Sequence, residues 1–232
     1  MKKHIMAGLL SLSVASSALA GVYSYSGGAY AVPDGNPVGA ASSLTVSGEG
    51  TAISDITVSL NVSGGYNGDL YAYLSYGGVV MPLVNRVGLG TINGGTAFGS
   101  ADSGFAVTLN STGSDVHWAS ASGGVLSGAF GADGRSISPI SPAVSFDTAG
   151  RVTLDGQFSG MNPNGTWTLF FADLVSGGGT SMVNGWSLDI TAVPEPVNVA
   201  VLIFGVGLIG VGITRRYRGS RKMAPPSARI PA

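Results

Sequence analysis

The chain has 232 residues, of which 44% are hydrophobic and only 10% are charged, against about 25% in ordinary soluble domains. All twelve acidic residues and only three arginines fall within residues 21–196, which gives that part a net charge of −9. Such a domain repels phosphate backbones, so nucleic-acid binding is disfavoured. The absence of cysteine excludes disulfides, thiolate metal sites and cysteine nucleophiles.

The first twenty residues have the pattern of a secretory signal peptide. Lys2 and Lys3 precede an apolar stretch that ends in Ala18-Leu19-Ala20. A basic start, a short apolar run and an A-x-A site are the parts of such a peptide. We predict a signal peptide at 1–20 with Ala18 and Ala20 as the cleavage-site residues; the alternative is an uncleaved anchor helix.

Residues 21–192 consist of short strand patterns. Apolar and polar residues alternate over 56–62 and 70–76, and this period of two predicts strands with one buried face. Two further strands contain Trp167 and Trp186, whose phase places both rings in the core. Weaker strands are predicted at residues 44–47, 79–84, 105–109 and 151–154.

Pairs of glycine and asparagine residues lie between these predicted strands. Pairs such as Gly77-Gly78, Asn67-Gly68 and Asn184-Gly185 are typical of the positive φ that tight hairpin turns require. No window from 21 to 192 has a helical period over ten or more residues. About eight short strands in one domain predict an all-β fold, a jelly-roll-like β-sandwich over residues 21–192.

A series of short motifs resembles the P domain, or Homo B module, that follows the catalytic domain of subtilisin-like proprotein convertases. The motifs lie, in chain order, at residues 32–37, 53–58, 66–70, 83–86, 162–169, 173 and 184–188. The resemblance covers about residues 32–191, but the glycine- and serine-rich region 87–150 departs from it. It implies a non-catalytic β jelly roll, which in convertases packs against the protease and supports its folding.

The domain has no evident catalytic constellation. Asp115 and His117 lie close in sequence, but no G-x-S-x-G motif accompanies them, and a lone histidine in a loop is more often solvated. Asp147 and Asp155 would act as a glycosidase pair only if the fold brought them together. Sparse acids in glycine-rich loops usually fix turns instead, so we predict a protein that is not an enzyme.

Three acids are candidates for a calcium site. Asp34, Asp69 and Asp173 lie at strand ends or in loops, and calcium prefers several hard oxygen ligands. No D-x-D-x-D-G loop is present, so the site would be assembled from distant segments. The alternative is that Asp69 and Asp173 are buried hydrogen-bonding residues that fix turns. No other cofactor is predicted.

Five tyrosines are candidates for stacking on sugars, although exposed tyrosine is also ordinary in sheets. They are Tyr23, Tyr25 and Tyr30 near the start of the mature chain, and Tyr71 and Tyr73 on the outward face of a strand.

The C-terminal segment contains an apolar run at 197–213 and then a basic cluster. As a helix the run is about 25 Å long, near the lower limit for crossing a bilayer. We predict a single transmembrane helix with the basic tail 219–232 on the cytoplasmic side. The G-x-G-x-x-G sequence at 205–210 falls inside this helix, which favours helix packing over nucleotide binding.

Residues 193–218 resemble the PEP-CTERM sorting signal of Gram-negative bacteria. The matching residues are Val193, Pro194, Glu195, Pro196, Arg215, Arg216 and Arg218. The resemblance implies recognition of the triplet by exosortase, a membrane protease, followed by removal of the helix. The fourteen residues after Arg218 are longer than the family tail, and a permanent single-pass anchor is the alternative.

These observations predict an exported protein, anchored through its C-terminal helix in the precursor and then located at the cell surface or in the extracellular matrix. Its P-domain-like module would be a non-catalytic binding or structural domain. The predicted partners are an exosortase-type membrane protease and exopolysaccharide. The alternatives are a surface polysaccharide hydrolase and an accessory domain for a separate subtilisin-like protease.

Overall fold

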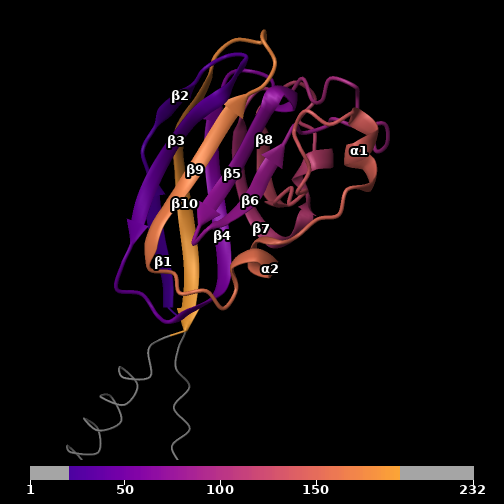
Figure 1. The fold of residues 1–232 in the computed structure, drawn as a ribbon. Coiled ribbons are helices and arrows are strands. Elements are labelled where there is room, and N and C mark those ends of the chain that lie inside the picture. The colour runs from indigo at the N-terminus through magenta and orange to yellow at the C-terminus, as the bar shows by residue number, and fades with distance from the viewer. Residues whose placement is uncertain (1–20, 194–232) are drawn as a thin grey trace, which may run out of the picture. The chain divides into compact units, whose positions relative to one another are not determined.

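The computed structural model describes residues 21–193 (Figure 1). Several predictions lie outside the described residues: the signal peptide and its cleavage site, Pro194 to Pro196, the transmembrane helix at 197–213, and the arginines and tail beyond it. Within residues 21–193, no helix has the length and apolarity that a membrane crossing requires.

Two β-sheets pack face to face, as predicted for a sandwich. The larger sheet has the spatial order β1-β10-β4-β7-β8, with β2 beside β10. Its strands are β1 (Gly21–Gly27), β2 (Tyr30–Val32), β4 (Ala52–Ser63), β7 (Phe105–Asp115), β8 (Leu126–Gly131) and β10 (Ser181–Val193). The smaller sheet, in the order β3-β9-β5-β6, contains β3 (Asn36–Val46), β5 (Leu70–Tyr76), β6 (Val79–Asn85) and β9 (Gly165–Asp173).

The strand connections are those of a jelly roll. When β2 and β8 are set aside, the remaining eight strands numbered along the chain have the orders 1-8-3-6 and 2-7-4-5. Two interlocked Greek keys give this arrangement, so the jelly-roll prediction is confirmed. The strand β8 is an addition that runs parallel to β7 at the sheet edge.

The core lies between the sheets and follows the alternation in the sequence. Every second residue of β5 is buried, from Leu70 to Tyr76, and the residues between them are half-exposed. Trp167 is fully buried and Trp186 is 3% exposed, so both rings belong to the core as predicted. The Tyr76 ring stacks on Trp167 with 3.9 Å between centroids.

Three local predictions are wrong. Residues 151–154 form no strand: Arg151 makes one isolated bridge, and Leu154 begins helix α2 (Leu154–Phe158), which Thr153 caps. Asn184-Gly185 makes no turn but lies at a bulge inside β10, because the strand continues through it. Asn67-Gly68 does lie in a turn between strands, but this turn is the buried 3₁₀ turn η1 (Asn67–Asp69) and not the predicted hairpin turn with positive φ. By contrast, Gly77-Gly78 makes the predicted two-residue hairpin, with both φ angles positive.

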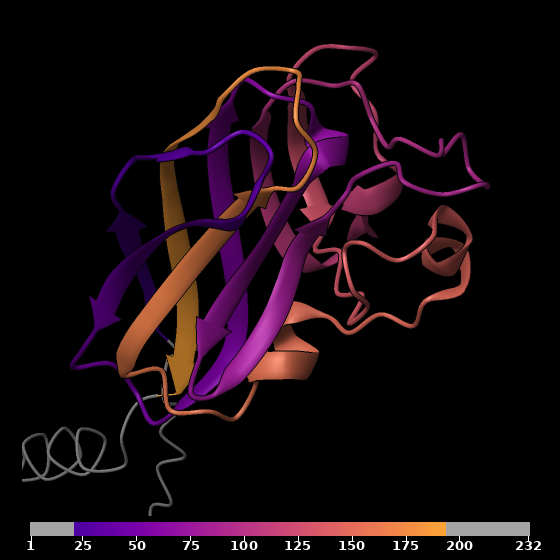
Figure 2. The same cartoon turned by 45° about the horizontal axis from the view of Figure 1, so that its top comes forward.

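The region 87–150, which the resemblance left unaligned, lies mostly beside the sandwich. Figure 2 shows its loops and helix α1 (Ala143–Thr148) extending past the side formed by β6 and β8. The same region contains β7, β8 and a second 3₁₀ turn, η2 (Val116–Trp118). It therefore combines two strands of the larger sheet with long connections that the strand pattern alone does not place.

The strand β10 runs from the loop that follows β9 to the end of the described chain. Gly21 pairs with Ala192 near the end of β10, so both ends of the described chain lie at one end of the sandwich. The loop between β9 and β10 lies at the opposite end. Thirteen residues of β10, at about 3.3 Å each, separate the two ends by roughly 40 Å.

Candidate functional site

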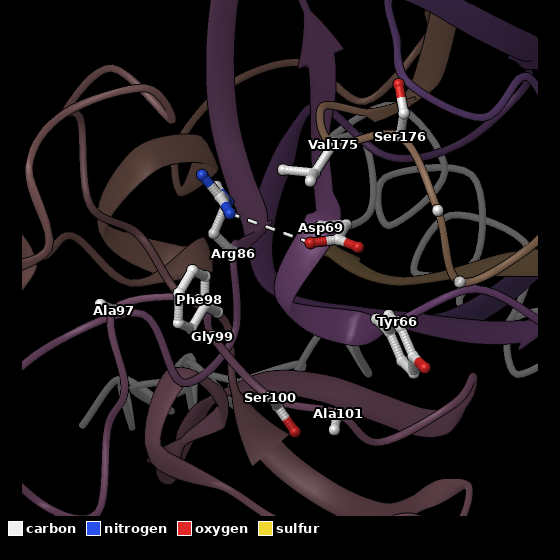
Figure 3. A pocket seen from close by; sticks show the side chains of 12 residues that line it. Tyr66, Asp69, Arg86, Ala97, Phe98, Gly99, Ser100, Ala101, Val175 and Ser176 are labelled. Carbon is white, nitrogen blue, oxygen red and sulfur yellow. Dashed lines mark ion pairs between the residues drawn. The ribbon is translucent and has the colours of Figure 1, made fainter.

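A cavity of about 510 Å³ lies at the end of the sandwich opposite Gly21 and Val193. We call it the end pocket. Its lining comes from η1, the residue after β6, the loop before β7 and the loop between β9 and β10, and consists of Tyr66, Asp69, Arg86, Ala97, Phe98, Gly99, Ser100, Ala101, Val175, Ser176, Gly177 and Gly178. Segments distant in sequence thus meet at one site (Figure 3).

A charged pair lies in the wall of the end pocket. The guanidinium of Arg86 is 3.9 Å from Asp69 Oδ1, and its Nε donates a hydrogen bond of 2.8 Å to the Gly68 carbonyl. Burial, together with the carboxylates of Asp173 and Asp34, raises the pKa of Asp69 to about 6 against the opposing effect of Arg86. One guanidinium therefore does not compensate the burial and repulsion that Asp69 experiences.

Two exposed aromatic rings flank this pair. The side chain of Phe98 is 83% exposed and that of Tyr66 is 45% exposed. In Figure 3, Phe98 lies near Arg86, and Tyr66 lies on the other side of Asp69. The Tyr66 ring also packs on Gly178, where a Cβ would lie 2.6 Å from its Cδ2 atom. The pocket thus offers apolar ring faces beside a carboxylate and a guanidinium.

The calcium candidates gather at the same end of the sandwich. Asp173 is fully buried; its Oδ1 accepts from the Val175 N–H at 3.2 Å, whereas its Oδ2 has no hydrogen-bond partner. Asp34 is exposed and accepts from the Gly177 N–H at 3.0 Å. Within residues 21–193, however, no group of three or more acidic or histidine side chains is arranged to hold a metal ion. Calcium binding therefore stays a prediction.

The expectation that His117 is solvated is wrong, because the side chain is fully buried. Its Nδ1 lies 2.8 Å from Asp133 Oδ2 and its Nε2 lies 2.9 Å from the Leu89 carbonyl. The ring also stacks on Phe146. Because the ring is fully buried and both of its nitrogens contact groups of neighbouring segments, its geometry is that of a residue that holds loops together.

An ion-pair network extends from this histidine. The guanidinium of Arg135 is 2.6 Å from Asp115 and 3.4 Å from Asp133, while Arg151 is 3.3 Å from Asp115. Together with Arg86, these are the three basic residues between 21 and 196. Each of them is thus paired with an aspartate, so the described surface presents excess negative charge.

The predicted glycosidase pair has separate partners. Asp147 accepts from the Thr91 N–H at 2.9 Å, and Asp155 accepts from the Ile56 N–H at 3.1 Å. Each carboxylate satisfies a backbone donor of a different segment, as expected of acids that fix loops and helix ends.

The five tyrosines suggested as sugar platforms do not line the end pocket. Tyr23, Tyr25 and Tyr30 pack against the core, and Tyr25 donates a hydrogen bond to Glu49. Tyr71 and Tyr73 are half-buried, and Phe170 stacks on Tyr73. Sequence reasoning missed Tyr66 and Phe98, although Phe98 is the one aromatic residue in the glycine-rich segment 87–104.

No family model matches the chain, and no curated protein matches it. Solved structures that match include a serine protease of Aeromonas sobria in complex with a chaperone, at 13% identity, and the same organism's serine protease, at 12%. Both alignments cover 75% of this chain with a TM-score of 0.39. The chain spans only 27% and 28% of those chains, so this remote likeness gives no basis for assigning a function.

Proposed function

We propose that residues 21–193 form an exported, non-catalytic module at the cell surface that binds extracellular polysaccharide in the end pocket. The observation that carries the proposal is the combination of the exposed rings of Phe98 and Tyr66 with the Asp69–Arg86 pair in one cavity. A cavity of this volume falls in the usual range of small-ligand sites.

The chemistry of the pocket suits a sugar ring. The C–H faces of pyranose rings are apolar and pack on aromatic side chains, while their hydroxyl groups both donate and accept hydrogen bonds. Asp69 accepts from such hydroxyls, Arg86 donates to them, and Ser100 and Ser176 do either. A largely exposed phenyl ring contributes little hydrophobic free energy to folding. Phe98 contributes most when a ligand covers the ring and removes its surface from water.

The position of the pocket supports display at a surface. A C-terminal sorting signal would continue from Val193, roughly 40 Å along β10 from the end pocket. Val193 and the end pocket therefore lie at opposite ends of the sandwich, so the end of β10 does not cover the pocket. The predicted residues for that processing are Val193, Pro194, Glu195 and Pro196, with Arg215, Arg216 and Arg218 behind the helix.

Binding and catalysis are separated by one experiment. The exported protein, purified from the producing bacterium, is incubated with that bacterium's exopolysaccharide, and bound protein and new reducing ends are both measured. We expect binding without new reducing ends, and about tenfold weaker binding for Phe98→Ala. Ile140→Ala, which removes an equally exposed apolar side chain elsewhere, is the control and should bind normally. New reducing ends would favour the hydrolase alternative.

The sorting part has a separate test. Mass spectrometry of the surface form should detect no peptide beyond about Pro196, because exosortase would have removed the helix. Recovery of residues 215–232 from that form would instead support a permanent anchor. Co-purification of a subtilisin-like protease would favour the accessory-domain alternative.

A further inference from the structure

A second cavity of about 480 Å³ lies directly beside the end pocket. We call it the side pocket. Gly99, Ser100 and Ala101 border both cavities, so one short stretch of backbone forms a ridge between them. The remaining lining of the side pocket is Gly88, Asn93, Gly94, Gly95, Thr96, Asp102, Trp118, Ala119, Ser120, Ser122 and Gly123.

Backbone hydrogen bonds hold the ridge in place. The Ser100 N–H donates to the Val87 carbonyl at 2.7 Å, and the Ser100 carbonyl accepts from the Gly68 N–H at 2.9 Å. The Asn67 N–H donates to the Asp102 carbonyl at 2.8 Å. Because the ridge is bonded to segments before β5 and after β6, both cavities are preformed, which lowers the entropic cost of binding.

The side pocket is lined by polar groups and one aromatic ring, and its one charged side chain, Asp102, is already hydrogen-bonded within the protein. Burial alone raises the pKa of Asp102, but hydrogen bonds from the Ala121 and Gly123 N–H groups and from serine hydroxyls outweigh it, so the pKa is lowered. Both carboxylate oxygens are thus already occupied. What remains is the half-buried ring of Trp118 and the amide of Asn93 with neighbouring hydroxyls, groups that suit a second sugar ring.

The net negative charge of the domain favours uncharged polysaccharides over anionic ones as ligands. Residues 21–193 contain eleven acidic residues and three arginines, a net charge of −8, and Arg86 is the one basic residue in the lining of the two cavities. This excess repels polyanionic chains such as polyuronates. An uncharged chain meets no such barrier.

From these observations we infer that the ligand is a linear, uncharged oligosaccharide that occupies both pockets and crosses the ridge at Gly99–Ala101. The inference rests on the proposed function, because it assigns the class and length of the ligand for the same end of the sandwich.

The test uses the bacterium's own exopolysaccharide, partly hydrolysed and separated by length into neutral and carboxylated fragments. Binding to the exported protein is measured by calorimetry for each length. We expect affinity to rise by about tenfold or more from fragments that fill one pocket to fragments that fill both. Ser120→Trp, which fills the side pocket from an exposed position, should remove this gain and lower the affinity for long fragments to that for short ones. Ser127→Trp on β8 lines neither pocket and is the matched control.

The outcomes separate the two proposals. If fragments of one or two sugars bind as tightly as long ones, or Ser120→Trp has no effect on long ones, the two-pocket inference is wrong and the proposed function stands. If carboxylated fragments bind more tightly than neutral ones, the assignment of an uncharged ligand is wrong. If neither the fragments nor the intact polysaccharide bind, the proposed function fails as well.

Discussion

Replacing Asp69 by asparagine should stabilise the protein while it weakens binding. Asp69 is 7% exposed, and in the folded state the pKa of its carboxyl is raised to about 6 from 3.8. An acid with a raised pKa in the folded state favours folding when it is protonated and opposes folding when it is ionised. The Asp69→Asn variant carries no charge at this position, so it avoids that penalty, but it replaces one of the two carboxylate oxygens proposed as acceptors for sugar hydroxyls with an NH₂ donor and makes the other a weaker, uncharged acceptor.

The size of the effect follows from the two pKa values. Each tenfold difference in proton affinity corresponds to about 1.4 kcal/mol, so the ionised Asp69 costs about 3 kcal/mol of folding free energy above pH 7. Below about pH 4 the carboxyl is protonated in the folded state and becomes protonated in the unfolded chain as the pH falls through 3.8, so the cost falls below about 1 kcal/mol. The variant should therefore gain most of its advantage between about pH 4 and pH 7.

Urea unfolding of wild type and Asp69→Asn at several pH values measures this difference directly. The variant should be more stable than wild type at about pH 7.5 and nearly equal to it at about pH 4. Its binding of exopolysaccharide should be weaker at about pH 7.5, where Asp69 is ionised in wild type. A variant that is less stable than wild type at neutral pH would show that the pair with Arg86 outweighs burial and repulsion. A stability difference independent of pH would show that ionisation of Asp69 does not cause it.

Three further substitutions test other parts of the structure by urea unfolding. Asp102→Asn should lose about 1–3 kcal/mol at neutral pH, because the lowered pKa reflects hydrogen bonds to the ionised form; the loss should shrink as pH falls below about 4 and wild type loses the same contribution. His117→Ala removes the hydrogen-bond partner of Asp133 Oδ2 and opens a cavity beside Phe146, while Arg135 still pairs with Oδ1, so it should cost about 2–5 kcal/mol; a loss below about 1 kcal/mol would contradict a structural role for the ring. In Gly68→Ala the new Cβ would lie 2.6 Å from the Ser100 backbone nitrogen, which predicts a loss of about 1–3 kcal/mol, while Gly150→Ala has open space and should change little.

The order of residues was enough to predict the class of fold and most of the core. Alternation over β4 and β5 marked the buried faces, and the phase of Trp167 and Trp186 placed both rings correctly. The prediction of the buried residues was correct because one face of each strand is buried, so apolar and polar residues alternate along the sequence. Gly77-Gly78 was equally local, since a two-residue hairpin requires positive φ at adjacent positions.

The environments of the polar residues and the location of the pocket could not be predicted in this way, because they depend on how distant segments pack together. His117 looked solvated because its partners, Asp133 and the Leu89 carbonyl, come from segments 16 and 28 residues away in sequence. Phe98 lines a pocket because the fold places the loop before β7 next to η1 and the β9–β10 loop. Burial and electrostatics depend on such long-range proximity, which residue order along a glycine-rich loop does not record, whereas strand periodicity is a local property.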